Sequence, residues 1–168
     1  MCYVERQIRT LLVIIVVAVT IVLFPNDWEQ ILFESRPPTN GVTVTDVVDG
    51  DTIKLSDGTT IRYIGIDTPE TKHPHKGVEC FGLQASKKNS ELVLGKTVKL
   101  TYDVSKTDRY GRVLAYVWVE GKMVNETLVK EGYAFATAFP PDVLYQDTFE
   151  MLEAEAKFEN RGLWNECE

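Results

Sequence analysis

Three short polar clusters in this chain carry carboxylates and arginines beside strand-like apolar runs, where a hydrophobic core would not accommodate them. The clusters are Asp49–Thr52, Asp67–Thr71 and Asp108–Arg112. Carboxylates can hold a hard divalent cation, and arginines can bind phosphate oxygens. Each cluster alone is most simply a solvated turn, because Asp and Gly are common turn residues. The three together indicate metal-assisted chemistry on a phosphodiester.

Asp51 and Asp67 are the candidate metal ligands. Asp51 opens an expected strand and Asp67 closes the next one, so pairing of these neighbours would bring both carboxylates to the same end of a barrel. Two carboxylates that lie close together repel each other unless a cation lies between them. Ca²⁺ takes about six to eight oxygens, so backbone carbonyls, waters and a substrate phosphate would complete its shell. We expect a calcium site that is weak alone and tighter with substrate.

A second set of side chains matches the needs of phosphodiester hydrolysis. Glu70 follows three residues after Asp67 and could orient or deprotonate the attacking water. Arg62 and Arg112 are fork-shaped donors that could stabilise the charge building on the phosphate. Tyr110 could hydrogen-bond a terminal phosphate. The simpler alternative for the arginines is surface ion pairing with nearby aspartates, worth about 0–1 kcal/mol.

Strands and helices must position these clusters. Five segments rich in Val, Ile, Thr and Tyr are expected to be strands, namely 42–48, 52–55, 60–66, 97–102 and 113–119. Three segments are expected to be helices: 82–94 with Leu83, Leu92 and Leu94 facing inward, 125–131 with Asn125 as the N-cap, and 145–159. Five short strands with intervening helices indicate an α+β, mainly β, fold: a five-stranded Greek-key barrel of the OB type with three helices.

The N-terminal part of the chain is different in character. Residues 10–26 carry no charge and are largely aliphatic. As a helix this run would span about 25 Å, near the roughly 30 Å of a bilayer's hydrocarbon core. Basic residues precede it and acidic ones follow it, which predicts a cytoplasmic N-terminus and an external domain. No Ala-x-Ala-like cleavage site follows, which favours a signal anchor over a cleaved signal peptide.

These features divide the chain into three expected parts. Residues 1–26 are a signal anchor or signal peptide, 27–41 are a linker containing consecutive prolines, and 42–168 are the folded domain. Cys80 and Cys167 are the cysteines of the exported part. An even pair outside the cytoplasm predicts a disulfide, with two free thiols as the alternative.

The charge distribution bears on the partner. A net charge of −7 is unusual for a protein that binds nucleic acid. The acidity is uneven, however: residues 62–112 hold ten Lys or Arg against six Asp or Glu, whereas residues 142–168 hold two against eight. The middle of the chain can therefore supply a local positive field.

Four segments resemble the staphylococcal (micrococcal) nuclease family, in order and over about residues 44–164. They are Val48–Thr52, Ile66–Pro74, Thr107–Arg112 and Gly121–Glu126. The resemblance implies an OB-fold barrel with three helices and Ca²⁺-dependent hydrolysis of DNA and RNA that leaves 3′-phosphates. It departs at the family's stacking aromatic, which falls on Ala138 with Phe139 beside it, and in the acidic tail.

The resemblance also implies a role for each matched residue. Asp51, Asp67 and the backbone carbonyl of Thr68 would hold Ca²⁺. Glu70 would be the general base or the positioner of the attacking water. The remaining implied roles are the transition-state pair Arg62 and Arg112, and the nucleotide phosphate pocket of Arg109 and Tyr110.

We therefore expect a monomeric calcium-dependent nuclease, membrane-tethered with an extracytoplasmic catalytic domain, or secreted if the N-terminal segment is cleaved. Its substrates would be DNA and RNA, preferably single-stranded or denatured. The competing interpretation is a catalytically silent OB-fold module that binds single strands by stacking and charge. A third is a structural or interaction domain at the cell surface.

Overall fold

The computed structural model describes residues 41–71 and 77–167. Its internal contacts divide the chain into Met1–Pro37 and Pro38–Glu168, and the described residues belong to the second unit. The expected signal anchor over 1–26 lies outside the described residues, as do 27–40 of the expected linker and 72–76 of the following loop. Among the helices that the structure describes, none has the length and apolar character needed to cross a bilayer.

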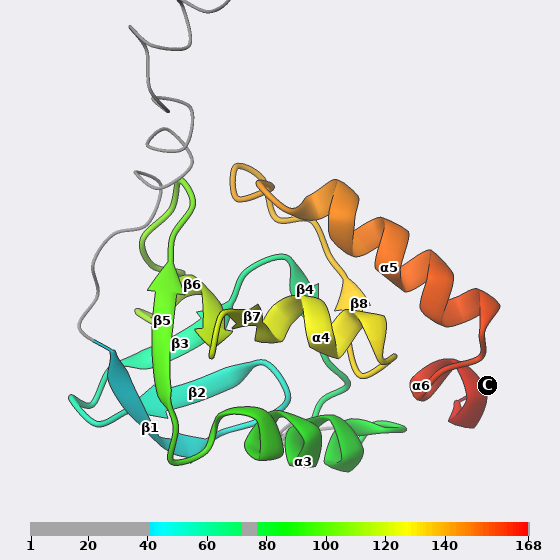
Figure 1. Cartoon of the computed structure of the whole chain (residues 1–168), viewed down its shortest axis with the longest axis horizontal. Helices are drawn as coiled ribbons and strands as arrows, with labels where there is room; N and C mark the ends of the chain where they lie inside the picture. The colour runs from blue at the N-terminus through cyan, green and yellow to red at the C-terminus, as the bar shows by residue number, and fades with distance from the viewer. Residues whose placement is uncertain (1–40, 72–76, 168) are drawn as a thin grey trace, which may run out of the picture. The chain divides into compact units, whose positions relative to one another are not determined.

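Five strands close into a barrel, as expected from the sequence (Figure 1). They are β1 (Val42–Val47), β2 (Thr52–Leu55), β3 (Thr60–Tyr63), β5 (Thr97–Thr101) and β6 (Val113–Val119). The order is β3-β2-β1-β5-β6, and the barrel closes because β3 also pairs with β6. That closing pair is parallel, with Ile61 opposite Val113, while the other pairs of the barrel are antiparallel. A short strand, β7 (Lys122–Met123), continues the sheet beside β6.

Alternating β-branched and aromatic residues explain these strands, because one face of each points into the barrel. The buried aliphatic side chains come from all five: Val44, Ile53, Leu55, Ile61, Val98, Leu100, Ala115 and Val117. A bulge in β1 between Val44 and Asp46 shifts the register against β2. Such a bulge bends a strand, which helps a small sheet to curve into a barrel.

The expectation of one continuous strand over 60–66 is wrong. β3 ends at Tyr63, and a separate strand, β4 (Ile66–Asp67), pairs with β8 (Phe135–Ala136). The chain turns at Gly65, whose φ of +77° favours glycine. A Cβ there would also lie 2.7 Å from the ring of Phe149. The turn leads the chain from β3 into β4, and Asp67 is the last residue of β4.

The three expected helices are present as α3 (Gly82–Val93), α4 (Val124–Lys130) and α5 (Gln146–Phe158). A fourth short helix that the sequence analysis did not predict, α6 (Leu163–Glu166), follows α5. In Figure 1, α3 lies along the bottom of the view and α5 along its upper right.

The inward face of α3 differs from the expected one. Leu92 is partly buried and packs against the core as expected, but Leu83 and Leu94 are exposed, at 62% and 49% of their surface. The helix instead buries Ala85, Asn89 and Val93, which recur every four residues and so form one row along the helix.

Asn125 is not the N-cap of α4, because the helix begins one residue earlier, at Val124. Its side chain is fully buried. The amide nitrogen Nδ2 donates to the Ile64 carbonyl at 2.9 Å, and Oδ1 accepts from the Val117 N–H at 3.0 Å. This amide therefore joins α4 to β6 and to the turn between β3 and β4.

The expected disulfide between Cys80 and Cys167 is present. It links the residue just before α3 to the end of α6 across a sequence separation of 87. In the chain-entropy description, closing a loop of this size stabilises the folded state by about 4–5 kcal/mol.

Candidate active site

Asp51 lies at the start of β2 and is almost completely buried, with 5% of its surface exposed. Its Oδ2 accepts hydrogen bonds from the backbone N–H and the hydroxyl of Thr68, at 2.9 and 3.0 Å. Its Oδ1 accepts from the Thr52 hydroxyl at 3.1 Å. Gly50 permits this approach, because a Cβ at that position would lie 2.6 Å from Thr68 Oγ1. The carboxylate therefore joins the first and second polar clusters.

Arg62 lies between the two carboxylates that the sequence analysis selected. Its Nη1 is 3.2 Å from Asp51 Oδ2, and its Nη2 donates to Asp67 Oδ1 at 2.7 Å. Nη1 also donates to the carbonyls of Tyr63 and Ile66, each at 2.9 Å. The turn between β3 and β4 supplies both carbonyls, so the local backbone holds the guanidinium in place. The structure thus brings Asp51, Arg62 and Asp67 together.

Asp67 ends β4, where it pairs with Phe135 of β8, and about half of its side chain (52%) is exposed. Burial of the remainder raises the pKa of this carboxyl above its ordinary value. The positive charge of Arg62 lowers the pKa in part, while the negative charges of Asp51 and Glu70 raise it further. The site therefore has an excess of negative charge that a bound cation would relieve.

Arg112 approaches the same carboxylates through an intermediate hydroxyl. Its Nε donates to Asp108 Oδ2 at 2.7 Å, and its Nη1 lies 3.4 Å from the Thr52 hydroxyl that binds Asp51. Burial would raise the pKa of Asp108, but hydrogen bonds from the Arg112 side chain and from the Arg112 and Tyr110 N–H groups lower it overall. Asp108 therefore stays ionised and aims the guanidinium toward the start of β2.

Arg109 and Tyr110 lie on the exposed turn that Asp108 organises. The Tyr110 ring is 69% exposed, and the guanidinium carbon of Arg109 lies 4.8 Å from its centre. The corresponding distance for Arg112 is 5.6 Å. This cation–π arrangement keeps the phenol and two positive charges on one surface, beside the buried carboxylate site.

Glu70 is exposed, and its backbone is held by two hydrogen bonds to Glu79. Its N–H donates to Glu79 Oε2 at 3.0 Å, and its carbonyl accepts from the Glu79 N–H at 2.9 Å. Sequence reasoning missed Glu79, because no short spacing relates two residues that meet across a loop.

The donor set fits a hard cation. Among residues 41–71 and 77–167, no three His, Cys, Asp or Glu side chains are grouped closely enough to hold a metal alone. The two carboxylates, Asp51 and Asp67, would therefore need further oxygens from the backbone, water or substrate, which suits Ca²⁺ better than zinc. Both carboxylates already contact Arg62, so a cation would compete with an ion pair.

Asp49 is a further, partly buried carboxylate that received no role from the sequence. Burial raises its pKa to about 6, and the charge of Asp51 adds to that effect. Its Oδ1 accepts from the Asp51 N–H at 3.2 Å, and its carbonyl accepts from the buried amide of Asn89 at 3.0 Å. Asn89 in turn accepts from the Tyr63 hydroxyl at 2.9 Å, so α3 supports the turn that carries Asp51.

Because the pKa of Asp49 is higher in the folded than in the unfolded chain, folding takes up a proton between about pH 4 and 6. The stability that protonation of Asp49 contributes to the folded state is therefore lost as the pH rises from about 4 to 6. We expect Asp49→Asn, which keeps the acceptor oxygen, to be more stable than wild type by about 1–3 kcal/mol at pH 7 without metal. Urea denaturation at pH 7 and pH 4 measures this, and an equal difference at both pH values would contradict it.

The position of the family's stacking aromatic remains unusual. The segment after β8 runs beside the Gly65 turn, where the Thr137 N–H donates to the Gly65 carbonyl at 3.0 Å. Ala138 is exposed and offers no ring, whereas Phe139 exposes 55% of its surface. A flat apolar surface is thus present one residue later than the resemblance implies.

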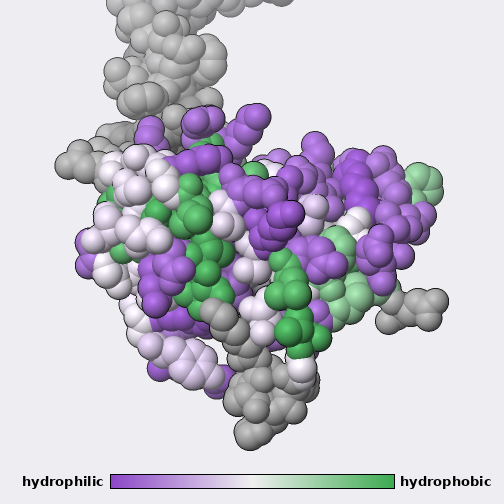
Figure 2. Space-filling model, turned by 90° about the horizontal axis from the view of Figure 1, so that it is seen from below, coloured by the Kyte–Doolittle hydropathy of each residue, from purple (hydrophilic) through white to green (hydrophobic). Residues whose placement is uncertain are grey.

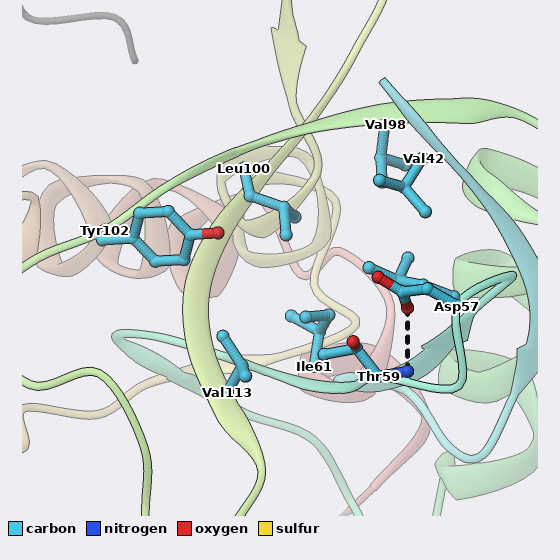
Figure 3. A pocket seen from close by; sticks show the side chains of 9 residues that line it. Val42, Asp57, Thr59, Ile61, Val98, Leu100, Tyr102 and Val113 are labelled. Atoms are coloured by element: carbon cyan, nitrogen blue, oxygen red, sulfur yellow. Dashed lines mark hydrogen bonds between the residues drawn. The ribbon is translucent and has the colours of Figure 1, made fainter. Parts of the chain in front are cut away.

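A pocket of about 350 Å³ lies elsewhere, at the end of the barrel where the β2–β3 hairpin turns (Figure 3). Its lining is mostly aliphatic, from Val42, Leu55, Ile61, Val98, Leu100 and Val113. At its rim the Thr59 N–H donates to Asp57 at 2.9 Å. None of the candidate catalytic, phosphate-binding or metal-binding residues lines it.

Comparisons with known proteins show which family the chain resembles. The family model described as staphylococcal nuclease homologue matches residues 60–166. A thermonuclease of Staphylococcus hyicus is 36% identical over 95% of this chain and 99% of its own length. Two proteins of Bacillus subtilis (strain 168), the SPbeta prophage-derived endonuclease YokF and the endonuclease YncB, are 47% and 45% identical over 74% of this chain. The chain spans 44% and 61% of their respective lengths.

Proposed function

The chain belongs to the staphylococcal nuclease family, and from this premise we propose that it hydrolyses phosphodiester bonds of DNA and RNA with Ca²⁺ as its cofactor. The observation that carries the proposal is the placement of Arg62 between Asp51 and Asp67, with Arg112 one hydroxyl away. Two carboxylates and two guanidiniums at one end of a barrel match what a phosphodiester and its hard cation require.

Each residue has a specific part in the proposed reaction. Asp51, Asp67 and the Thr68 carbonyl would hold Ca²⁺, which would supply polarisation of the phosphate and a lower pKa for water. Glu70 orients the attacking water or accepts its proton. Arg62 and Arg112 donate to the phosphate oxygens as negative charge builds on them. The water oxygen bonds to phosphorus, the bond from phosphorus to the 5′ oxygen breaks, and that oxygen leaves as a hydroxyl after taking up a proton, so the phosphate remains on the 3′ side.

Substrate binding is proposed to use the exposed turn beside this site. Arg109 and Tyr110 bind a terminal phosphate, since their charge and hydroxyl face solvent next to Arg112. An open surface of this kind admits a flexible single strand more readily than a rigid duplex, which supports a preference for single-stranded or denatured nucleic acid.

We further propose that the domain acts outside the cytoplasm as a monomer, tethered by residues 1–26 or released by their cleavage. The uncharged run over 10–26 and the disulfide between Cys80 and Cys167 support export. Figure 2 shows one face of the molecule, on which hydrophobic side chains lie among hydrophilic ones.

The test incubates the full chain with denatured DNA or with RNA in Ca²⁺, then in excess EGTA. We expect cleavage in Ca²⁺, its loss in EGTA and its return when Ca²⁺ is restored. The products should accept a 3′ label only after phosphatase treatment, because their 3′ ends carry phosphate. Absence of cleavage in Ca²⁺ at neutral and alkaline pH would refute the enzymatic proposal. Retained binding of single strands in that case would favour the non-catalytic module.

A further inference from the structure

The backbone of Glu70 is held from both sides by one residue. Glu79 accepts the Glu70 N–H on its carboxylate and donates its own N–H to the Glu70 carbonyl. These two bonds, of 3.0 and 2.9 Å, fix the peptide groups on either side of the Glu70 Cα. The Glu70 side chain is exposed. Because the two bonds fix the Glu70 backbone, they set the position of the Cα from which the carboxylate extends.

Residues 79–82 form a rigid support for this segment. Gly82 lies so close to it that a Cβ would be 2.9 Å from the Glu70 carbonyl oxygen and 3.0 Å from that of Pro69. Phe81 adopts a left-handed conformation, with φ of +66°, and its ring packs 5.3 Å from that of Tyr133. The α3 helix begins at Gly82, so its first turn packs directly against the backbone of Pro69 and Glu70.

The disulfide secures the same support. Cys80 lies between Glu79 and Phe81, and its bond to Cys167 ties the support to the end of α6. The Gly82 N–H also donates to the Glu79 carbonyl at 3.0 Å, which closes the turn around Cys80. Loss of this cross-link would leave Glu79 attached to α3 but free of the C-terminal end.

We propose that Glu79 is a positioning residue for Glu70 and that the Cys80–Cys167 disulfide holds Glu79 in place, so that turnover depends on the thiol–disulfide state of the protein. The inference rests on the proposed function, in which Glu70 handles the attacking water. A misplacement of about 1 Å at a reacting group can cost about 10²-fold in rate, so a support of this kind has a measurable effect.

The redox step requires a dithiol reductant. The reductant supplies two electrons and two protons, the S–S bond breaks and two thiols form, while the reductant becomes its own cyclic disulfide. Reoxidation reverses each change. The Glu70 carboxylate itself takes no part in this exchange.

The first arm of the test compares Glu79→Ala with Glu79→Gln in the full chain. We expect Glu79→Ala to lower kcat about tenfold or more with KM changed by less than about twofold, because substrate contacts are intact. Glu79→Gln keeps an acceptor oxygen and should retain kcat within about threefold. Glu91→Ala, at an exposed position later in α3, is the matched control. Wild-type kcat in Glu79→Ala would overturn the inference, whereas an inactive wild type would instead refute the proposed function.

The second arm measures amide hydrogen exchange and cysteine alkylation, which do not depend on activity, and then compares kcat. Amide hydrogen exchange at Glu70 should be faster in Glu79→Ala, in the Cys80→Ser/Cys167→Ser variant and in wild type treated with dithiothreitol. Alkylation without reductant should leave peptides containing Cys80 and Cys167 unmodified. The double serine variant, assayed where circular dichroism shows it folded, should have a several-fold lower kcat. Unchanged exchange and turnover in that variant would overturn the role of the disulfide.

Discussion

The Arg112→Gln variant is expected to lose about 10²–10³-fold in kcat while remaining folded, because it removes a preorganised donor to the charge that builds on the phosphate. The structure explains why the effect should be catalytic. Arg112 is only partly buried, and its fork is aimed at the start of β2 by Asp108. Single-turnover cleavage of denatured DNA in saturating Ca²⁺ measures the loss, and near wild-type turnover would mean that the role assigned to Arg112 is wrong.

Two companion variants separate the charge of Arg112 from its geometry. Arg112→Lys keeps the positive charge but loses the planar fork, so we expect it to recover only a small part of the rate. Asp108→Asn keeps Arg112 and removes the carboxylate that aims it. The kcat of Asp108→Asn should fall between the values of wild type and Arg112→Gln. The unfolding free energies of all three variants should lie within about 1 kcal/mol of wild type.

The Asn125→Ala variant is expected to lose about 2–5 kcal/mol of unfolding free energy, a large part of the stability of a domain of this size. The substitution leaves the Val117 N–H and the Ile64 carbonyl buried without their partner. Each such group costs about 1–3 kcal/mol. Urea denaturation at pH 7, followed by tryptophan fluorescence and circular dichroism, gives the difference.

Asn165→Ala is the matched control, because Asn165 is exposed and, among the described residues, its side-chain amide donates only to Glu166, at 3.2 Å. Its stability should stay within about 0.5 kcal/mol of wild type. Asn125→Asp keeps the acceptor oxygen but loses the donor and buries a charge, so it should also be strongly destabilised. Equal stability of Asn125→Ala and wild type would show that water or a backbone shift replaces both bonds.

Much of the fold can be read from short segments of the sequence. Alternating Val, Ile and Thr residues predict the strands of the barrel, and the helical segments are found within a few residues of their observed bounds. Gly65 shows where this reading stops. The apolar run from Thr60 to Ile66 looks continuous, but the positive φ at Gly65 and the contact with Phe149 of α5 divide it into β3 and β4.

The candidate site shows the same division. Asp51, Asp67 and Arg112 stand out because each lies in a compact polar cluster beside a strand. Glu79 lies outside these clusters, and its importance comes from its contact with the backbone of Glu70. The bridging position of Arg62 likewise depends on the turn that presents the carbonyls of Tyr63 and Ile66.

The sequence by itself determined the strands, the helices, the cysteine pair and the polar clusters, because periodicity, residue type and turn chemistry act over a few neighbouring residues. Only the tertiary structure decided which groups meet: Arg62 between Asp51 and Asp67, Asn125 between β6 and the Gly65 turn, and Glu79 on the backbone of Glu70. The physical reason is that each contact joins different segments of the folded chain, and the longest of them, from Asn125 to the Ile64 carbonyl, spans 61 positions.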